Sequence, residues 1–112
     1  MGQVNVALAA QKYLNDGASI TLTSGILSEQ PIRYGANASA VNAAVEGFVL
    51  GAAIELPRGL RINAVSPTLV NESLEAYGPY FYGIETVPVK RVALAYSRSV
   101  EGAETGKTYR VW

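Results

Sequence analysis

The sequence predicts an α/β protein with a three-stranded parallel sheet and about three main helices. Segments with the apolar spacing of a helix alternate with short segments rich in β-branched residues, in the order helix, strand, helix, strand, helix, strand. A helix between two strands is the usual crossover that makes consecutive strands parallel. The chain has 112 residues, the size of one ordinary domain, so we assign residues 1–112 to a single domain.

The first third of the chain predicts a helix, a strand and a loop. Residues 3–15 are rich in alanine and end in an Asn-Asp-Gly sequence, which is typical of a helix that stops at a glycine. Apolar residues alternate with threonines in residues 19–24, which is the period of a strand. Residues 26–34 show no period, and we expect a loop there.

Residues 36–55 contain the clearest helix. Larger apolar residues form one stripe at helical spacing, and small residues form a second stripe. The first stripe is Val41, Val45, Phe48 and Ala52, and the second is Ala40, Ala44, Gly47 and Gly51. We expect the first stripe to pack on the sheet and the second to let another backbone approach closely. Pro57 and Gly59 end this helix.

The remaining segments complete the alternation. Residues 60–67 predict a strand with a proline at its exit, residues 89–100 a helix, and residues 107–112 the last strand. Residues 68–87 are rich in Tyr, Pro and Gly, and we expect one short helix around residues 71–76. A connection of this length is more often functional or mobile than a plain linker.

Composition excludes several kinds of chemistry. The chain has no histidine and no cysteine, so it offers no thiol nucleophile, no imidazole base and no disulfide, and we expect no metal site. Nine basic residues balance nine acidic ones, which gives no electrostatic reason to expect nucleic acid or a membrane as a partner. No segment matches a secretory signal or a membrane span, so we expect a cytoplasmic protein.

Three segments carry a resemblance to a known family. They are Ser24-Gly25, Ala43-Ala44-Val45-Glu46-Gly47-Phe48 and, most specifically, Glu55-Leu56-Pro57-Arg58-Gly59-Leu60-Arg61-Ile62-Asn63-Ala64-Val65-Ser66-Pro67. They resemble the C-terminal half of the short-chain dehydrogenase/reductase family, and the resemblance extends over nearly the whole chain. It implies a truncated Rossmann-like fold. Complete members begin with a Gly-rich dinucleotide-binding turn, and nothing similar opens this chain. We therefore expect no cofactor for this chain alone, and NAD(P) only if the N-terminal half is restored.

The catalytic groups of the family are also missing. Its members use a Ser at a strand end, and a Tyr and a Lys one turn apart on the next helix, where the Lys lowers the pKa of the Tyr. An ungapped alignment places Gly25, Ala38 and Asn42 at these three positions, so we expect no catalytic residue. A gapped alignment recovers a pair of hydroxyls, Ser24 and Tyr34, but not the Lys. We favour a packed ring for Tyr34 and a cap on a loop backbone group for Ser24, over catalytic roles.

Further candidate residues have two interpretations each. The resemblance implies that Ser66, Pro67 and Thr68 touch nicotinamide in a complete enzyme, whereas here they are expected to be only the strand exit. The tyrosines of residues 77–82 occupy a loop that covers substrate in the family. We favour a self-packed loop or a subunit contact over a ligand lid. For Glu72 and Glu75 we favour solvated charges over an acid/base pair.

Two functions remain open. The first is a fragment without catalysis that associates into a homodimer or higher oligomer through the small-residue stripe, the unpaired edge of residues 19–24 or the tyrosine-rich segment. The second is a component of an NAD(P)-dependent oxidoreductase that is active only with the missing N-terminal half. The sequence identifies no substrate.

Overall fold

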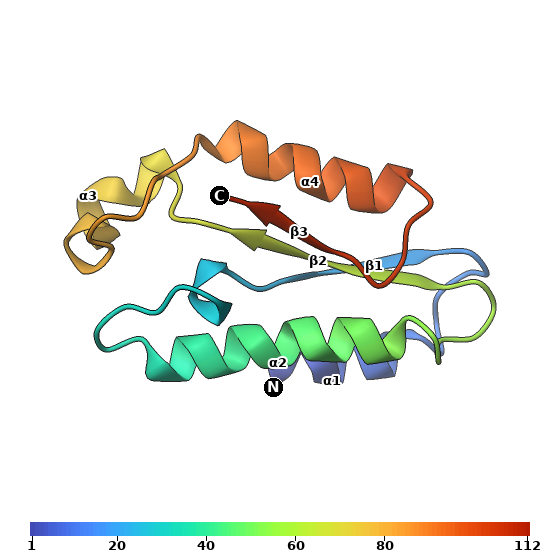
Figure 1. The fold of residues 1–112 in the computed structure, drawn as a ribbon. Coiled ribbons are helices and arrows are strands. Elements are labelled where there is room, and N and C mark those ends of the chain that lie inside the picture. The colour runs from blue at the N-terminus through green and yellow to red at the C-terminus, as the bar shows by residue number, and fades with distance from the viewer.

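The structure, a computed structural model, describes residues 1–112 and confirms the predicted α/β class (Figure 1). The strands are β1 (Ser19–Thr23), β2 (Arg61–Pro67) and β3 (Thr108–Val111), all parallel in the order β1-β2-β3. The helices are α1 (Gly2–Ala10), α2 (Ala36–Ala52), α3 (Leu74–Tyr77) and α4 (Val89–Glu101). The three longer ones are the predicted main helices. None of the helices is long and apolar enough to cross a bilayer.

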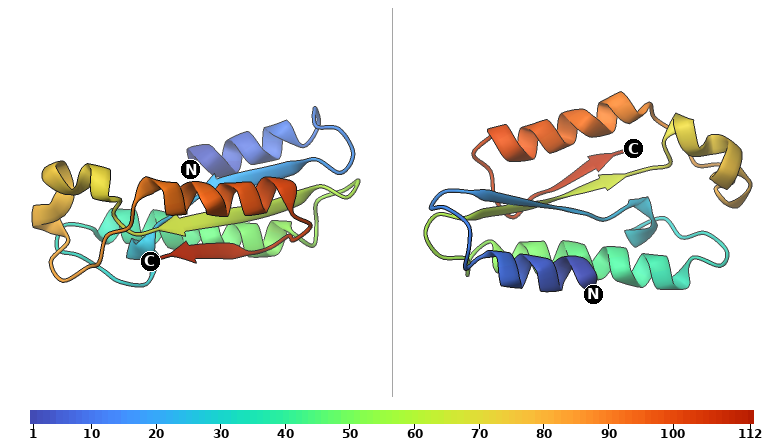
Figure 2. Two further views of the ribbon diagram at one scale, coloured as in Figure 1. Left: turned by 90° about the horizontal axis from the view of Figure 1, so that it is seen from above. Right: turned by 180° about the vertical axis from the view of Figure 1, so that it is seen from behind.

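The elements form three layers. Helices α1 and α2 lie on one face of the sheet, and α4 lies on the other (Figures 1 and 2). The core under α2 includes Val49 and Ile62, both fully buried, and the core under α4 includes Val65 and Val92. β2 is the central strand and is buried over almost its whole length, as expected for a parallel strand covered on both faces. The molecule is flat, with extents of 44 × 26 × 18 Å.

Helix α2 packs on the sheet with most of the predicted stripe, together with Val49, which was not predicted. Its buried residues are Val45, Val49 and Ala52, whereas Val41 is 47% exposed and Phe48 is only partly buried. The first turns of α2 extend past the carboxyl end of β2 (Figure 1). The small-residue stripe of α2 is exposed, and a Cβ atom placed on Gly47 or Gly51 would meet nothing within 4 Å. No backbone of the same chain approaches this stripe.

Helix α1 is shorter than the predicted residues 3–15, because Arg58 binds the chain that follows it. The Arg58 guanidinium donates to the carbonyl oxygens of Gln11 and Leu14, the latter at 2.7 Å, and pairs with Asp16 at 3.1 Å. These bonds hold residues 11–17 in turns instead of a further helical turn.

The outer edge of β1 is covered at its carboxyl end by a side chain of α1. Gln3 Nε2 donates to the Thr23 carbonyl oxygen at 2.7 Å, and the Thr23 N–H donates to Gln3 Oε1 at 2.8 Å. The amide thus pairs with Thr23 as a neighbouring strand would, which protects part of an otherwise open edge.

The two connections at the carboxyl end of the sheet contain short helical turns. Residues 26–34, predicted as a loop, begin with a 3₁₀ turn, η1 (Ile26–Ser28), which packs on α2. The segment 68–87 contains η2 (Asn71–Ser73), α3 and η3 (Gly78–Tyr80), which confirms the predicted short helix. A parallel bridge between Val70 and Val87 closes the base of this segment.

Candidate functional site

The carboxyl ends of β1 and β2 meet at one edge of the sheet, where they border a cavity of about 360 Å³. It is lined by Gly25 after β1, Asn42 on α2, Pro67 and Thr68 at the end of β2, and parts of residues 69–81. We call it the strand-end cavity. Ligands of open parallel sheets bind in the crevice outside the carboxyl ends of the strands, so this is a candidate ligand site.

The structure brings together in this cavity two of the three residues that occupy the family's catalytic positions. Gly25 is extended, with φ −179°, and a Cβ atom placed on it would lie 3.0 Å from Asn42 Nδ2. Ala38 lies one turn before Asn42 on α2 and is exposed. The positions adjoin one another as a site requires, but a glycine, an alanine and an amide exchange no proton near neutral pH. Asn42, whose amide makes no side-chain hydrogen bond within the chain, could bind a polar ligand group.

The structure does not bring the two hydroxyls of the gapped alignment to this cavity. Ser24 is buried, and its Oγ has no hydrogen-bond partner, so the expected backbone cap is wrong. Tyr34 is 89% exposed, so the expected packed ring is wrong as well. Tyr34 has a positive φ of 69° in a turn that the Gly35 N–H closes on the Ile32 carbonyl oxygen at 3.2 Å, and this turn directs the ring away from the core.

The three vestigial cofactor positions separate into two groups. Pro67 and Thr68 line the strand-end cavity, whereas Ser66 does not and is completely buried without a partner for its Oγ. Thr68 is already engaged, because its Oγ1 donates to the Glu85 carbonyl oxygen at 2.9 Å and its N–H donates to the Val111 carbonyl oxygen at 3.0 Å. These bonds support its interpretation as a structural strand exit.

The tyrosine-rich segment is not self-packed. Tyr77, Tyr80 and Tyr82 are 56%, 54% and 84% exposed, so the interpretation as a self-packed loop is wrong for these rings, and the alternative of a subunit contact stays a prediction. Glu72 has a contact that the sequence did not reveal, because its Oε1 accepts from the Val89 N–H at 3.1 Å and so caps the start of α4. Glu75 is exposed, as expected for a solvated charge.

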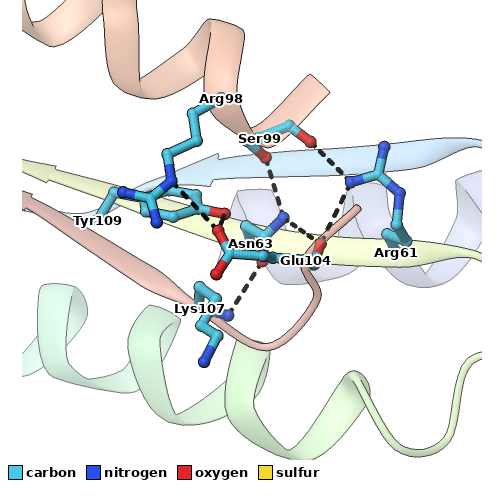
Figure 3. Close-up of polar contacts among 7 residues, drawn as sticks. All are labelled: Arg61, Asn63, Arg98, Ser99, Glu104, Lys107 and Tyr109. Atoms are coloured by element: carbon cyan, nitrogen blue, oxygen red, sulfur yellow. Dashed lines mark hydrogen bonds and ion pairs between the residues drawn. The ribbon is translucent and has the colours of Figure 1, made fainter. Parts of the chain in front are cut away.

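The amino edge of the sheet, opposite the strand-end cavity, holds a polar cluster that sequence reasoning missed (Figure 3). Its members are Arg61, Asn63, Arg98, Ser99, Glu104, Lys107 and Tyr109, which we call the turn network. Asn63 is fully buried, and its Nδ2 donates to Ser99 Oγ at 3.2 Å and to the Glu104 carbonyl oxygen at 2.9 Å. Its Oδ1 accepts from the Lys107 N–H at 3.0 Å. The network therefore fixes the turn between α4 and β3.

The charges of the turn network stabilise one another. Tyr109 donates to Glu104 Oε1 at 2.9 Å, which lowers the pKa of the Glu104 carboxyl, and the nearby Arg98 and Lys107 lower it further. Burial raises the pKa of the Tyr109 hydroxyl, and the bond to Glu104 adds to that rise. Arg98 also stacks over the Tyr109 ring, 4.9 Å from its centroid. The buried amide of Asn63 and the groups around it are bonded within the chain, so we assign the network a structural role.

A parallel sheet between helical layers, with its candidate site at the carboxyl edge, defines the class of α/β proteins that bind ligands at strand ends. Comparison with known proteins identifies the family. A family model described as enoyl-(acyl carrier protein) reductase matches residues 1–108, and the chain belongs to the short-chain dehydrogenase/reductase family. No curated protein matches the chain.

Solved structures agree with this assignment. The protein lin1944 from Listeria innocua is 49% identical, with a TM-score of 0.97, and the match covers 99% of this chain and 56% of that one. A small-chain dehydrogenase is 32% identical, with a TM-score of 0.79, over 98% of this chain and 51% of that one. Another, in complex with NADPH, is 29% identical, with a TM-score of 0.81, over 98% and 56%. The chain thus spans about half the length of the structures it matches, which agrees with a C-terminal half of this fold.

Proposed function

We propose that the 112-residue chain is a reductase-fold fragment that transfers no hydride by itself and self-associates. The observation that carries the first part is the pairing of Gly25 with Asn42 in the strand-end cavity. In the family these positions hold the Ser and the Lys, and the Lys keeps a Tyr ready to exchange a proton with the substrate. Tyr77 is the one ionisable side chain that lines the cavity here, and no cation accompanies it.

The residues of the strand-end cavity fit only part of a dinucleotide. A space of about 360 Å³ is large enough for a nicotinamide ring, and the free amide of Asn42 offers a donor and an acceptor. A pyrophosphate needs a Gly-rich turn that runs from a strand directly into a helix. In this chain β1 is followed by η1 and a further loop before α2 begins, and no Lys or Arg lines the cavity. We therefore propose that the chain alone binds no NAD(P).

Exposed apolar surface supports self-association. The accessible surface is 6768 Å², against about 5,900 Å² for a compact monomer of this mass. Large apolar side chains project from α1 and α2 beside the open stripe at Gly47 and Gly51. They are Val6 and Leu8 on α1, Val41 and Leu50 on α2, and Ile54 just after it, with exposed fractions between 46% and 89%. A second copy that covers this face would bury these side chains, and small residues would let two helices approach closely.

A second candidate function is that of an oxidoreductase component completed by further residues. Its support is the strand-end cavity itself, whose walls are formed in the chain alone, and the NADPH complex of a 29% identical relative. In that case the pyrophosphate site and a replacement for the missing proton-transfer groups come from outside these 112 residues.

One experiment separates the two functions. The purified chain is analysed by light scattering for its molar mass and titrated with NADPH under observation of cofactor fluorescence. It is then mixed with the N-terminal half of the Listeria innocua relative, and NADPH oxidation is followed with a panel of carbonyl and enoyl substrates. We expect an oligomer that neither binds NADPH nor reduces any substrate in either condition. NADPH binding by the chain alone contradicts the first proposal, and activity only in the mixture establishes the second.

A further inference from the structure

A second cavity, distinct from the strand-end cavity, lies between two loops at the same end of the molecule. Its volume is about 570 Å³. The loop before α2 contributes Pro31, Ile32, Arg33 and Tyr34. On the other side lie Pro79 and Tyr80 of η3, and Tyr82. We call it the tyrosine cavity. Both loops project beyond the carboxyl ends of the strands (Figures 1 and 2). Its volume is typical of a site for a small organic ligand.

Arg33 is the one charged side chain that lines the tyrosine cavity, and it has no partner in the chain. The ion pairs of the protein use Arg58, Arg98 and Arg110, and the guanidinium of Arg61 donates to backbone carbonyl oxygens. Arg33 takes part in no ion pair and no side-chain hydrogen bond, and no acidic residue lines the cavity. The cavity therefore carries an uncompensated positive charge, with donors suited to binding a carboxylate through two hydrogen bonds.

The aromatic side chains supply the other half of a ligand site. Tyr34, Tyr80 and Tyr82 line the cavity with rings that are mostly exposed, although each could gain by burying its ring. Tyr34 is held with φ 69°, a conformation that a bulky residue rarely adopts, in the turn that directs its ring to the cavity side of the loop. Flat rings beside prolines and a guanidinium favour a ligand with a planar aromatic or conjugated body.

We propose that the tyrosine cavity binds a small organic anion in which a planar aromatic group carries a carboxylate. The carboxylate pairs with the Arg33 guanidinium, and the planar group packs among Tyr34, Tyr80 and Tyr82. Tyr80 and Tyr82 belong to the segment that covers substrate in the family, so the proposal names a ligand class for that region of the fold. The site uses no residue of the strand-end cavity, so its test can fail while the proposals on catalysis and NAD(P) stand.

The test uses the whole 112-residue chain and three probes. Cinnamate has the planar body and the carboxylate, cinnamamide has the same body without the charge, and hexanoate has the carboxylate on a flexible aliphatic chain. Amide chemical shifts are followed by NMR during each titration. We expect saturable shifts with cinnamate in residues 31–35 and 79–83, and binding of cinnamamide and of hexanoate weaker by about tenfold. Raising the salt concentration weakens the cinnamate complex more than the cinnamamide complex.

Substitutions of Arg33 test whether its guanidinium binds the carboxylate of the ligand. Arg33→Gln removes the preference for cinnamate over cinnamamide, whereas Arg33→Lys, which keeps the charge but not the planar fork, retains part of it. Arg91→Gln is the matched control, because Arg91 is another exposed arginine without an ion pair and does not line this cavity. Circular dichroism checks that each variant is folded.

Four results overturn the proposal. These are equal affinity for cinnamate and cinnamamide, equal effects of Arg33→Gln and Arg91→Gln, shifts centred on residues 67–70 of the strand-end cavity, and no saturable shift at millimolar cinnamate. NADPH binding at the strand-end cavity would shift the signals of residues 67–70, so it can be distinguished from cinnamate binding at residues 31–35 and 79–83.

Discussion

The polar side chains at the two edges of the sheet differ in their hydrogen bonding. At the amino edge, the buried Asn63 of the turn network has three hydrogen bonds within the chain. At the carboxyl edge, the amide of Asn42 and the guanidinium of Arg33 make no side-chain bond. Buried polar groups that are satisfied internally stabilise a fold, whereas groups left free beside a cavity are available to a ligand. The amide of Asn63 therefore stabilises the fold, whereas Asn42 and Arg33 have donors left for a ligand.

The largest expected effect tests this contrast with one substitution type at both edges. Asn63→Ala removes three hydrogen bonds of a fully buried side chain and leaves the Lys107 N–H without its partner, and we expect a loss of about 3 kcal/mol in the free energy of unfolding. Asn42→Ala at the carboxyl edge removes an amide without such bonds, and we expect a change within about 0.5 kcal/mol. Urea unfolding of the two variants measures both values. Similar losses of unfolding free energy in the two variants would contradict the proposed difference between the two edges.

The next effect concerns association and not folding. Ile54 is 89% exposed just after α2, and Ile54→Glu places a charge on the proposed contact face. We expect the dissociation constant of the oligomer to rise by at least about tenfold, because the charge would have to be buried. Leu94→Glu on α4, where the side chain is 65% exposed, is the matched control and is expected to leave the mass unchanged. Sedimentation velocity measures both. Dissociation by the control alone would move the interface to the α4 side.

Most of the fold could be predicted from the sequence because its signals are local. The alternation of 3.6-residue and two-residue periods located every helix and strand of the three layers, and the crossover rule gave the parallel order. The errors have a common cause in Val41 and Tyr34. Both belong to segments that extend past the carboxyl edge of the sheet, and a periodic pattern does not reveal where the sheet ends beneath it.

The candidate site could be predicted only in part, for the same physical reason. The resemblance matched Gly25 and Asn42 to catalytic positions of the family and residues 66–68 to its nicotinamide contacts. The structure groups Gly25, Asn42, Pro67 and Thr68, but not Ser66, around one cavity. The turn network joins Asn63 to residues about 40 positions away, and such pairings have no local signal. Arg33 was missed because an unpaired arginine is recognised only after every other ion pair is known.

A smaller effect concerns the edge of β1. Gln3→Ala removes both hydrogen bonds to Thr23, and we expect a loss of about 1 kcal/mol in the free energy of unfolding, because these bonds are exposed to water. Gln11→Ala is the control, since Gln11 donates only to the nearby Leu8 carbonyl oxygen. Urea unfolding measures the loss, and light scattering shows whether the uncovered edge increases association. Equal stability of the two variants would mean that Gln3 does not cover this edge in solution.

The smallest effect is the pH dependence of the turn network, and its sign follows from two shifts in opposite directions. The pKa of Glu104 is lowered from 4.5, so its contribution is present above that pH and is lost as pH falls through the lower folded value. The pKa of Tyr109 is raised from 10.0, so its contribution is present below that pH and is lost as pH rises through the higher folded value. Glu104→Gln should flatten the acid side of a curve of unfolding free energy against pH, and Tyr109→Phe the alkaline side. Glu75→Gln, at an exposed carboxylate of the carboxyl edge, should leave both sides as they are. If Glu75→Gln flattened the acid side as much as Glu104→Gln, the stabilising charges would not be confined to the amino edge.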